Sequence, residues 1–318
     1  LPMNSIRRIK LFLALSRTPH GILDIAAPAF CALVYLGGFP GADTVGIGLL
    51  TAFAGYTAIY ALNDVVDYSS DREKFASCVG SDEKNSEKNA HTQDCEQGYL
   101  DSMMVRHPMA QGLLPFRDGA AWAAGWAVVA LIGAWLLNPV CALIFLAGAA
   151  LETFYCLLWR VSPWRAVVSG FVKNMGAAAA LFAVDPDPSF AFMLLVFACL
   201  FFWEIGGQNI PADWTDMEQD RRLKAQTIPV RLGAQKSSAL ALLCLCISLV
   251  FCMILFFISF PSARLAAPLA AVVIGSGLLV EPAFRLYKNR RREDAMALFN
   301  RASYFPASML TIAVILII

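Results

Sequence analysis

Charged residues are scarce in this sequence. Aspartate, glutamate, lysine and arginine make up only 15% of the 318 residues, whereas 58% are hydrophobic. A soluble globular domain carries about a quarter charged residues, and a chain this apolar could not cover its surface in water. The lipid bilayer is the alternative solvent. The net charge is +1 and no basic stripe stands out, so the sequence does not indicate nucleic-acid binding.

The sequence also lacks the features of a secreted disulfide scaffold. Only two of the nine cysteines, Cys78 and Cys95, lie in polar sequence, and they have no CxxC spacing. The others fall in apolar runs, where a free cysteine behaves as a small hydrophobic residue. The basic segment 1–10 is not followed by a small-residue cleavage site, so we expect the first apolar run to be retained as a span.

Long apolar runs fill the rest of the chain. A helix needs about 20 mostly apolar residues to cross the hydrocarbon core of a bilayer. Nine runs meet this requirement, at 20–38, 43–63, 119–137, 139–159, 164–184, 188–207, 237–260, 265–284 and 302–318. The sequence therefore predicts an all-α, polytopic membrane bundle that forms one domain over residues 1–318. A polar insert at 73–104 interrupts it, and this insert is a disordered loop, a lid over the active site or a loop that contacts a partner.

Basic residues predict the orientation of the bundle. They gather before span one and after spans two, four, six and eight, whereas the opposite loops hold only Arg264. Because cytoplasmic loops are enriched in lysine and arginine, we expect a cytoplasmic N-terminus and an external C-terminus in the plasma (inner) membrane. The insert and the acidic segments after spans two and six would then all be cytoplasmic.

Both of these acidic segments have helical spacing. In the first, Asn63, Asp67 and Asp71 are four residues apart, so on a helix they drift by only ~40° per step and line one face. The second segment also gives a polar stripe if it is helical, because Asn209, Asp213, Asp216 and Asp220 then fall within about 60° of one another at ~100° per residue.

Two carboxylate stripes on one side of the membrane suit diphosphate chemistry. Mg²⁺ prefers carboxylate, phosphate and water oxygens. Two or three Mg²⁺ ions between the stripes could hold an allylic diphosphate and neutralise the charge that develops as its C–O bond breaks. Two alternatives remain open at this point. The aspartates could be solvated helix ends, or the chain could be a transporter of a cation or small molecule, although transport sites usually lie near the membrane midplane.

The motifs resemble those of the UbiA superfamily of intramembrane prenyltransferases. Segment 63–71 is similar to its first aspartate motif, 213–221 to the second, 227–233 to the stretch that follows, and 107–112 to its Arg-Pro-x-x-x-Gly segment. The resemblance covers the chain and implies nine spans around a central cavity. It also implies Mg²⁺-dependent transfer of a polyprenyl group from its diphosphate to a lipophilic, aromatic acceptor, as in quinone or related lipid biosynthesis.

The resemblance also implies roles for individual residues. It places six residues at the metal and diphosphate site: Asn63, Asp67, Asp71, Asp213, Asp216 and Asp220. Four of these would be catalytic, namely Asp67, Asp71, Asp216 and Asp220. Substrate-binding candidates besides Asn63 are Asp64, Arg106, Tyr155, Arg160, Asn209 and Arg221. His107 stands where the family usually has arginine. The neighbouring Arg106 is therefore expected to take the role of that arginine.

Four further ionisable residues lie within predicted spans. Burying a charge in lipid is costly, so these side chains should face the cavity or each other. Asp24 and Glu204 are candidates for acceptor binding or proton removal. Glu152 and Lys173 lie on consecutive spans and are expected to form a structural ion pair.

Overall fold

The computed structural model describes residues 5–82 and 104–318, and this part of the chain contains helices and no strands. Most of the insert predicted at 73–104, including Cys95, lies outside the described residues, as do the side chains of 77–82 with Cys78. The helices are α1 (Ser5–Leu15), α2 (Thr18–Asp24), α3 (Ala26–Leu36), α4 (Ala42–Val66), α5 (Tyr68–Asp82), α7 (Phe116–Leu137), α8 (Pro139–Leu157), α9 (Arg165–Val184), α10 (Phe190–Trp203), η1 (Glu204–Asn209), α11 (Ile210–Thr215), α12 (Met217–Arg222), α13 (Ile228–Ser259), η2 (Pro261–Ala263), α14 (Ala266–Gly275), η3 (Ser276–Val280), α15 (Glu281–Asn289), α16 (Arg292–Ser303) and α17 (Phe305–Ile317).

Within the described residues, nine helices or helix series are long and apolar enough to cross a membrane. The predicted all-α, nine-span fold is therefore confirmed, and the protein is a multi-pass membrane protein. Three boundaries differ clearly from the prediction. The sixth span ends at Thr215 rather than at 207, the seventh begins at Ile228 rather than at 237, and the ninth begins at Arg292 rather than at 302. All three extensions carry charged residues, which lower the local hydropathy and so conceal the ends of the helices in the sequence.

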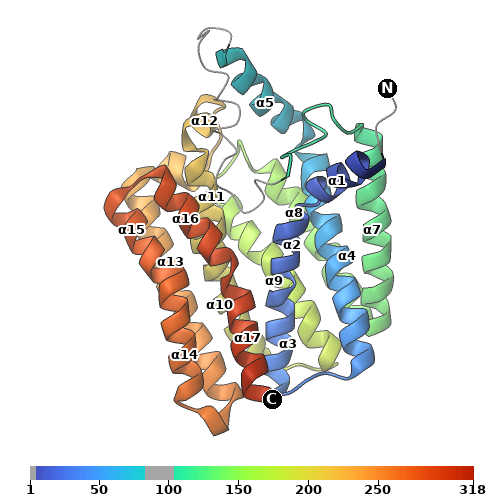
Figure 1. Cartoon of the computed structure of the whole chain (residues 1–318), viewed down its shortest axis with the longest axis vertical. Helices are drawn as coiled ribbons and strands as arrows, with labels where there is room; N and C mark the ends of the chain where they lie inside the picture. Colours follow the sequence, from blue (N-terminus) through green and yellow to red (C-terminus); the bar gives the residue numbers. More distant parts are fainter. Residues whose placement is uncertain (1–4, 83–103) are drawn as a thin grey trace.

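The helices form a closed bundle. Consecutive spans pack side by side from α4 through α7, α8, α9 and α10 to α13, and α17 returns to pack against α3 (Figure 1). The last span therefore lies beside the first. α3 also packs against α9, which brings the N-terminal span into the middle of the molecule.

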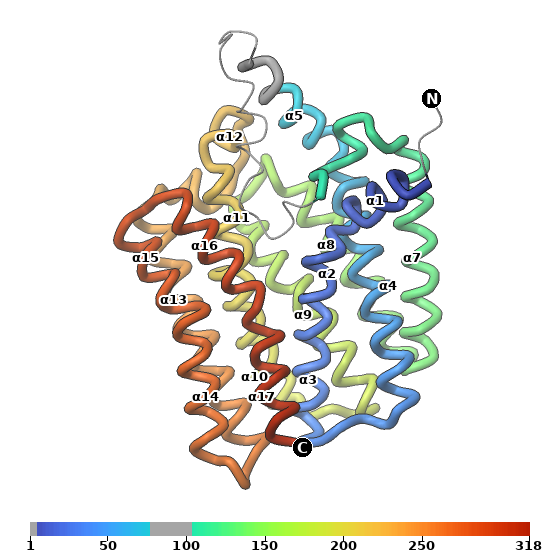
Figure 2. Tube along the Cα trace, in the orientation of Figure 1, coloured from blue at the N-terminus to red at the C-terminus, as the bar shows by residue number. Residues whose placement is uncertain are grey.

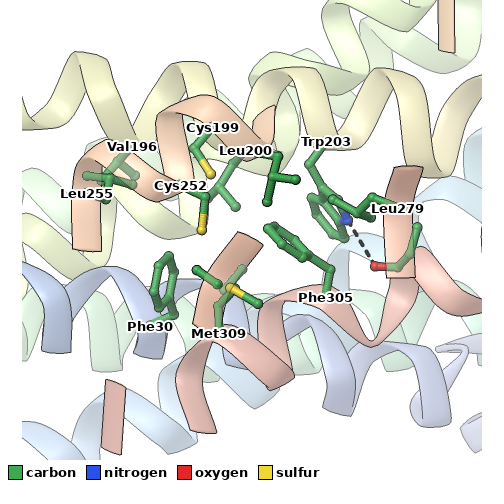
Figure 3. Packing of buried hydrophobic residues seen from close by; sticks show 14 of the residues in the cluster. Phe30, Val196, Cys199, Leu200, Trp203, Cys252, Leu255, Leu279, Phe305 and Met309 are labelled. Atoms are coloured by element: carbon green, nitrogen blue, oxygen red, sulfur yellow. Dashed lines mark hydrogen bonds between the residues drawn. The ribbon is translucent and has the colours of Figure 1, made fainter. Parts of the chain in front are cut away.

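A large aromatic and aliphatic core packs α3 and α10 against the C-terminal helices (Figure 3). Phe30, Phe256 and Phe305 are each almost completely buried in it. Trp203 lies at one edge, and its indole Nε1 donates a hydrogen bond of 2.9 Å to the Ala302 carbonyl. An indole N–H needs such a partner when it is buried. The bond fixes the end of α10 against α16, immediately before the helix changes its winding.

That change is a π-helical turn, η1, which separates α10 from α11. It contains Gly206 and Gly207, and side chains would not fit there. A Cβ atom on Gly206 would lie 2.7 Å from the Ala241 carbonyl oxygen, and one on Gly207 would lie 2.9 Å from the Ala302 Cβ. Small residues let membrane helices approach closely. The glycine pair thus lets the π turn pack directly against α13 and α16.

The two acidic motifs lie at the same end of the bundle. Figure 2 shows α5, α11 and α12 at the end opposite the C-terminus. The Gln219 side chain of α12 donates a hydrogen bond of 3.2 Å to the Lys74 carbonyl of α5. The motifs are therefore neighbours, although more than a hundred residues separate them in the sequence.

Candidate active site

The first motif continues one helical path from α4 into α5. Asp67 is the C-terminal cap of α4, and the Asp71 N–H donates to the Asp67 carbonyl at 2.8 Å. Because the winding is barely interrupted, Asn63, Asp67 and Asp71 share a face and line a common cavity, in keeping with their spacing. Asp64 points elsewhere. It is buried outside the cavity lining and accepts from Arg17 at 3.4 Å.

The second motif begins inside the π turn. Asn209 ends η1, Asp213 lies on α11 and Asp216 joins α11 to α12, and all three line the same cavity. π-helical turns in membrane and soluble helices are frequent at functional sites. Asp220 is buried beside this motif but does not line the cavity. Burial raises the pKa of Asp220, and the Asp216 carboxylate raises it further against the opposing charge of Lys74.

The cavity between the motifs has a volume of about 590 Å³, which is typical of small-molecule sites. Its wall is polar at the motif end, and it becomes apolar with depth, where Phe145, Ala183 and Leu310 contribute. Such a cavity can hold a molecule with a charged head and an apolar tail.

Arginine supplies positive charge at the motif end. The Arg165 guanidinium, at the first residue of α9, donates to the Tyr155 hydroxyl and lies 4.2 Å from the centre of the Tyr155 ring. Asn209 donates to the same hydroxyl at 3.2 Å. Arg165, Tyr155 and Arg106 all line the cavity. Tyr155 and Arg106 were predicted from the sequence, and Arg165 was not.

Two predicted basic residues lie elsewhere. Arg160 forms a 2.5 Å ion pair with Glu73 in which both side chains are about half exposed, and Arg221 lies 3.8 Å from Glu218 at the surface. Neither lines the cavity. The turn between α8 and α9 carries Arg160 outward, whereas the inner face of α9 presents Arg165. A signal for this was present, since Arg165, Ser169 and Lys173 form a polar stripe with a spacing of four in an apolar span.

His107 bridges two aspartates of the first motif. Its Nδ1 lies 3.1 Å from an Asp64 oxygen and 2.9 Å from an Asp71 oxygen. Burial alone would lower the pKa of His107, but the Asp64 and Asp71 carboxylates raise it to about 9. Burial acts to raise the pKa of Asp71, yet the imidazolium holds it below its usual value. His107 is therefore cationic at neutral pH, and it supplies positive charge beside the first motif.

Two oxygens in the site have no hydrogen-bond partner among the described residues. They are Asp213 Oδ2 and Asn209 Oδ1, and both are buried. Leaving a buried acceptor unsatisfied costs about 1–3 kcal/mol. Burial also raises the pKa of Asp67, with the Asp71 carboxylate raising it further. These oxygens fit a hard divalent cation, which would satisfy them and would favour the ionised form of Asp67.

The predicted Glu152–Lys173 pair is wrong. Lys173 Nζ lies 2.6 Å from Asp24 Oδ2 and 4.0 Å from Glu204 Oε2. Glu152 instead accepts a 2.7 Å hydrogen bond from Asn63 Nδ2. Consecutive spans do touch, but Asp24 on α2 reaches the lysine first because α3 inserts against α9.

The family model that describes the UbiA prenyltransferase family matches residues 25–305. The chain belongs to the UbiA prenyltransferase family. The resemblance inferred from the motifs is thus confirmed, and this UbiA family member is an enzyme of the prenyltransferase class. The match begins within the first span and ends within the last.

Solved structures share this fold at low sequence identity. An apo UbiA homolog from Aeropyrum pernix K1 is 17% identical with a TM-score of 0.68, over 92% of this chain and 97% of that one. A UbiA homolog from Archaeoglobus fulgidus bound to GPP and Mg²⁺ is 14% identical with a TM-score of 0.60, over 95% and 99%. A digeranylgeranylglyceryl phosphate synthase is 15% identical with a TM-score of 0.63, over 97% and 98%. Among curated proteins, none matches this UbiA family member.

Proposed function

We propose that this enzyme uses Mg²⁺ to transfer a polyprenyl group from an allylic polyprenyl diphosphate to a lipophilic aromatic acceptor in quinone or related lipid biosynthesis. One observation carries the proposal. The two aspartate motifs face a single cavity in which Asp213 Oδ2 and Asn209 Oδ1 are buried with no hydrogen-bond partner in 5–82 and 104–318, and that cavity deepens into an apolar chamber.

The donor set supports Mg²⁺ as the cofactor. Metal-ligand candidates that line the cavity are Asn63, Asp67, Asp71, Asp213 and Asp216. When bound, Mg²⁺ would neutralise the charge that develops on the leaving diphosphate. The Archaeoglobus fulgidus homolog bound to GPP and Mg²⁺ has the same fold, which agrees with this proposal. Asp220 is buried next to the second motif but does not line the cavity, so we assign it a supporting role behind the ligands rather than direct contact with the metal.

Protein cations complete the proposed diphosphate site. Arg165 and Arg106 line the cavity beside the motifs, and Lys74 Nζ lies 4.0 Å from Asp71 Oδ1. Arginine binds phosphate oxygens through a planar fork of donors. Asp64 acts through His107, which it holds against Asp71. These groups orient the diphosphate, while the apolar chamber holds the prenyl chain and excludes water from the reacting carbon.

Family membership favours this function over the transporter considered from the sequence. We place the site on the cytoplasmic side of the plasma (inner) membrane, following the distribution of basic residues. We also propose that residues 1–318 form one domain with 73–104 as a cytoplasmic insert, since the nine spans pack as a single ring.

The test is prenyl transfer by the purified, detergent-solubilised protein. Geranyl, farnesyl and longer labelled diphosphates are supplied with a panel of aromatic acceptors, with Mg²⁺ or with EDTA. Asp67→Asn and Asp216→Asn should each lower transfer at least ~100-fold, because losing one charged ligand costs several kcal/mol of transition-state stabilisation.

Glu281→Gln is the matched control. Glu281 pairs with Arg301 at the surface, outside the cavity, so this variant should retain activity within about twofold. Transfer that persists in EDTA, or near-normal turnover in well-folded Asp67→Asn protein, would overturn the assignment.

A further inference from the structure

The cavity contains a second polar layer, deeper than the aspartate motifs. Tyr56 and Tyr60 of α4, Lys173 of α9 and Glu204 at the start of η1 line the cavity at this level. Asp24 of α2 is buried and contacts them without lining the cavity. Tyr60 donates to Asp24 Oδ2, and Lys173 donates to the same oxygen at 2.6 Å. Charged groups at this depth of a membrane protein are costly and usually mark a functional site.

We propose that this layer binds the acceptor, and that Glu204 accepts a hydrogen bond from an acceptor hydroxyl group. The inference rests on the proposed prenyl transfer and names its acceptor class, a neutral phenol-type molecule rather than an aromatic carboxylate. Glu204 touches the substrate in this scheme, and Tyr56 supplies a second polar contact.

Two atoms that face the cavity carry the proposal. Glu204 is 8% exposed and lines the cavity, and its Oε2 has no hydrogen-bond partner among the described residues. Lys173 Nζ, at 4.0 Å, is beyond hydrogen-bonding distance of that oxygen. The Tyr56 hydroxyl also lines the cavity and is buried with no hydrogen-bond partner among the described residues. Both groups lie near Lys173, whose Nζ is 5.9 Å from the centre of the Tyr56 ring and 4.0 Å from Glu204 Oε2. A ligand that donates to one and contacts the other would explain both unsatisfied groups.

The charge of the layer selects against a carboxylate. Lys173 is shared by two carboxylates, those of Asp24 and Glu204. His20 Nε2 lies 3.9 Å from Asp24 Oδ1, so even a protonated His20 would only bring the layer to neutrality. A further cation near the layer is Arg17, which lies 5.7 Å from the centre of the Tyr60 ring and pairs with Asp64 at 3.4 Å. Within the layer itself the positive charges do not exceed the negative ones, so an acceptor carboxylate would be buried without its own cation, which is strongly disfavoured. A hydroxyl donor fits the open Glu204 oxygen without adding charge.

The depth of the layer suits a single aromatic ring. Lys173 follows Arg165 by eight residues on α9, so it lies ~12 Å deeper at 1.5 Å per residue. This distance, from the diphosphate to the deep layer, can be spanned by the allylic carbon, an aromatic ring beside it and a hydroxyl on that ring. Gly176 keeps the wall open at this level, because a Cβ atom there would lie 3.0 Å from the Tyr56 hydroxyl.

The chemistry balances with the groups present. The C–O bond of the prenyl diphosphate breaks, and its electron pair leaves with the diphosphate. A ring carbon of the acceptor forms the new C–C bond to the prenyl carbon, and the same ring carbon then loses its proton to the released diphosphate. Glu204 holds the hydroxyl and increases electron density on the ring through that hydrogen bond, without taking part in the net proton transfer.

If Glu204 had only a structural role, the Glu204→Gln variant would behave like the wild type. Glu204 Oε1 accepts a 2.7 Å hydrogen bond from Ser169 Oγ, which joins the sixth helix series to α9. A glutamine can keep that bond through its amide oxygen, so Glu204→Gln would leave a structural link intact. It would nevertheless remove the charge that strengthens a hydrogen bond to a ligand hydroxyl.

The experiment compares three small acceptors with geranyl diphosphate as donor: 4-propylphenol, its methyl ether 4-propylanisole, and 4-hydroxybenzoate. The wild type should have a KM for 4-propylphenol at least tenfold below that for either other compound. Glu204→Gln should raise the KM for 4-propylphenol at least tenfold and should leave that for 4-propylanisole within twofold. Mg²⁺-dependent hydrolysis of geranyl diphosphate without acceptor, and the KM for each acceptor, should stay within twofold in the control Glu281→Gln.

Equilibrium binding separates this inference from the proposed function. Binding of 4-propylphenol is followed by quenching of protein fluorescence, to which Trp203, 5.5 Å from Lys173 Nζ, contributes. If the wild type does not cleave the prenyl diphosphate, the proposed prenyl transfer is overturned. Even then, a tenfold weaker binding of 4-propylphenol to Glu204→Gln would support the acceptor layer. Tyr56→Phe, which keeps the ring, should weaken the same binding. Unchanged binding in both variants, or tighter binding of 4-hydroxybenzoate than of 4-propylphenol by the wild type, would overturn the inference.

Discussion

Arg160 and Arg165 are separated by one short turn, yet only Arg165 lines the cavity. The sequence places an arginine near the end of the fourth span but does not give the rotation of the chain through 158–164. That rotation depends on how α8 and α9 pack, which is a tertiary property. Asp67 and Asp71 were predictable because a spacing of four on a helix fixes a shared face, whereas Asp220, which was also predicted at the metal site, does not line the cavity.

Replacing the two arginines separately tests this reassignment. Arg165→Ala should raise the KM for geranyl diphosphate at least ~tenfold, because a hydrogen bond to a charged group contributes about 1.5–3 kcal/mol. Arg160→Ala should change it by less than about twofold, since an exposed ion pair such as Arg160–Glu73 is worth only ~0–1 kcal/mol. Steady-state kinetics with varied donor measure both. A larger effect at Arg160 would restore the assignment made from the sequence.

His107 gives the site a pH-dependent stability. Its pKa, raised to about 9 by Asp64 and Asp71 against the effect of burial, lies above the usual value of ~6.5. A raised pKa of this kind stabilises the folded protein fully below about 6.5, and the contribution is lost as the pH rises through about 9. We expect Tm, measured in detergent without divalent cations, to fall between pH 7 and pH 9.5.

His107→Gln serves as the reference for that measurement. Other groups also titrate in this window, so the informative quantity is the difference in Tm between wild type and variant at each pH. This difference should be largest at pH 6–7 and should shrink towards pH 9.5. A difference independent of pH would mean that His107 is not charged in the folded protein.

At the scale of helices, the π turn η1 separates the two polar layers of the cavity. It begins at Glu204 of the deep layer and ends at Asn209 of the second motif. The sequence predicted a span that ended at 207, because hydropathy cannot distinguish a π turn from the end of a helix. Gly206 and Gly207 were a usable signal, since adjacent glycines in an apolar helix indicate close packing of the backbone.

Gly206→Ala should therefore destabilise the bundle. The new Cβ atom would lie 2.7 Å from the Ala241 carbonyl, which is backbone and cannot move aside, so we expect a cost of ~1–3 kcal/mol and a lower Tm. Gly277→Ala is the matched control, because it lies in the other π turn, η3, with no atom within 4 Å of the added Cβ. Thermal unfolding followed by circular dichroism compares them. Equal Tm values would contradict the close packing of η1.

At the scale of the whole molecule, the nine spans and their order were predictable, because a bilayer demands long apolar helices whatever their packing. The closure of the ring could not be predicted from the sequence, because it depends on the contact of α17 with α3, two helices at opposite ends of the chain. The resemblance to UbiA proteins supplied the central cavity. Asp24 and Glu204 were candidates for acceptor binding from the sequence, but their grouping with Lys173 and the two tyrosines required the structure, because these residues come from four separate elements.

The structure places both aspartate motifs at one end of the bundle, and the basic residues predict that this end is cytoplasmic. Cysteine labelling in intact bacterial cells tests this. In a Cys78→Ser, Cys95→Ser background, Asp187→Cys and Arg222→Cys each place one cysteine at an exposed position, at opposite ends. A membrane-impermeant maleimide should label Asp187→Cys in intact cells and Arg222→Cys only after permeabilisation. The unaltered background is the control, because its remaining cysteines lie in apolar spans. The reverse pattern would place the diphosphate site outside, where the cytoplasmic pool of prenyl diphosphates could not reach it.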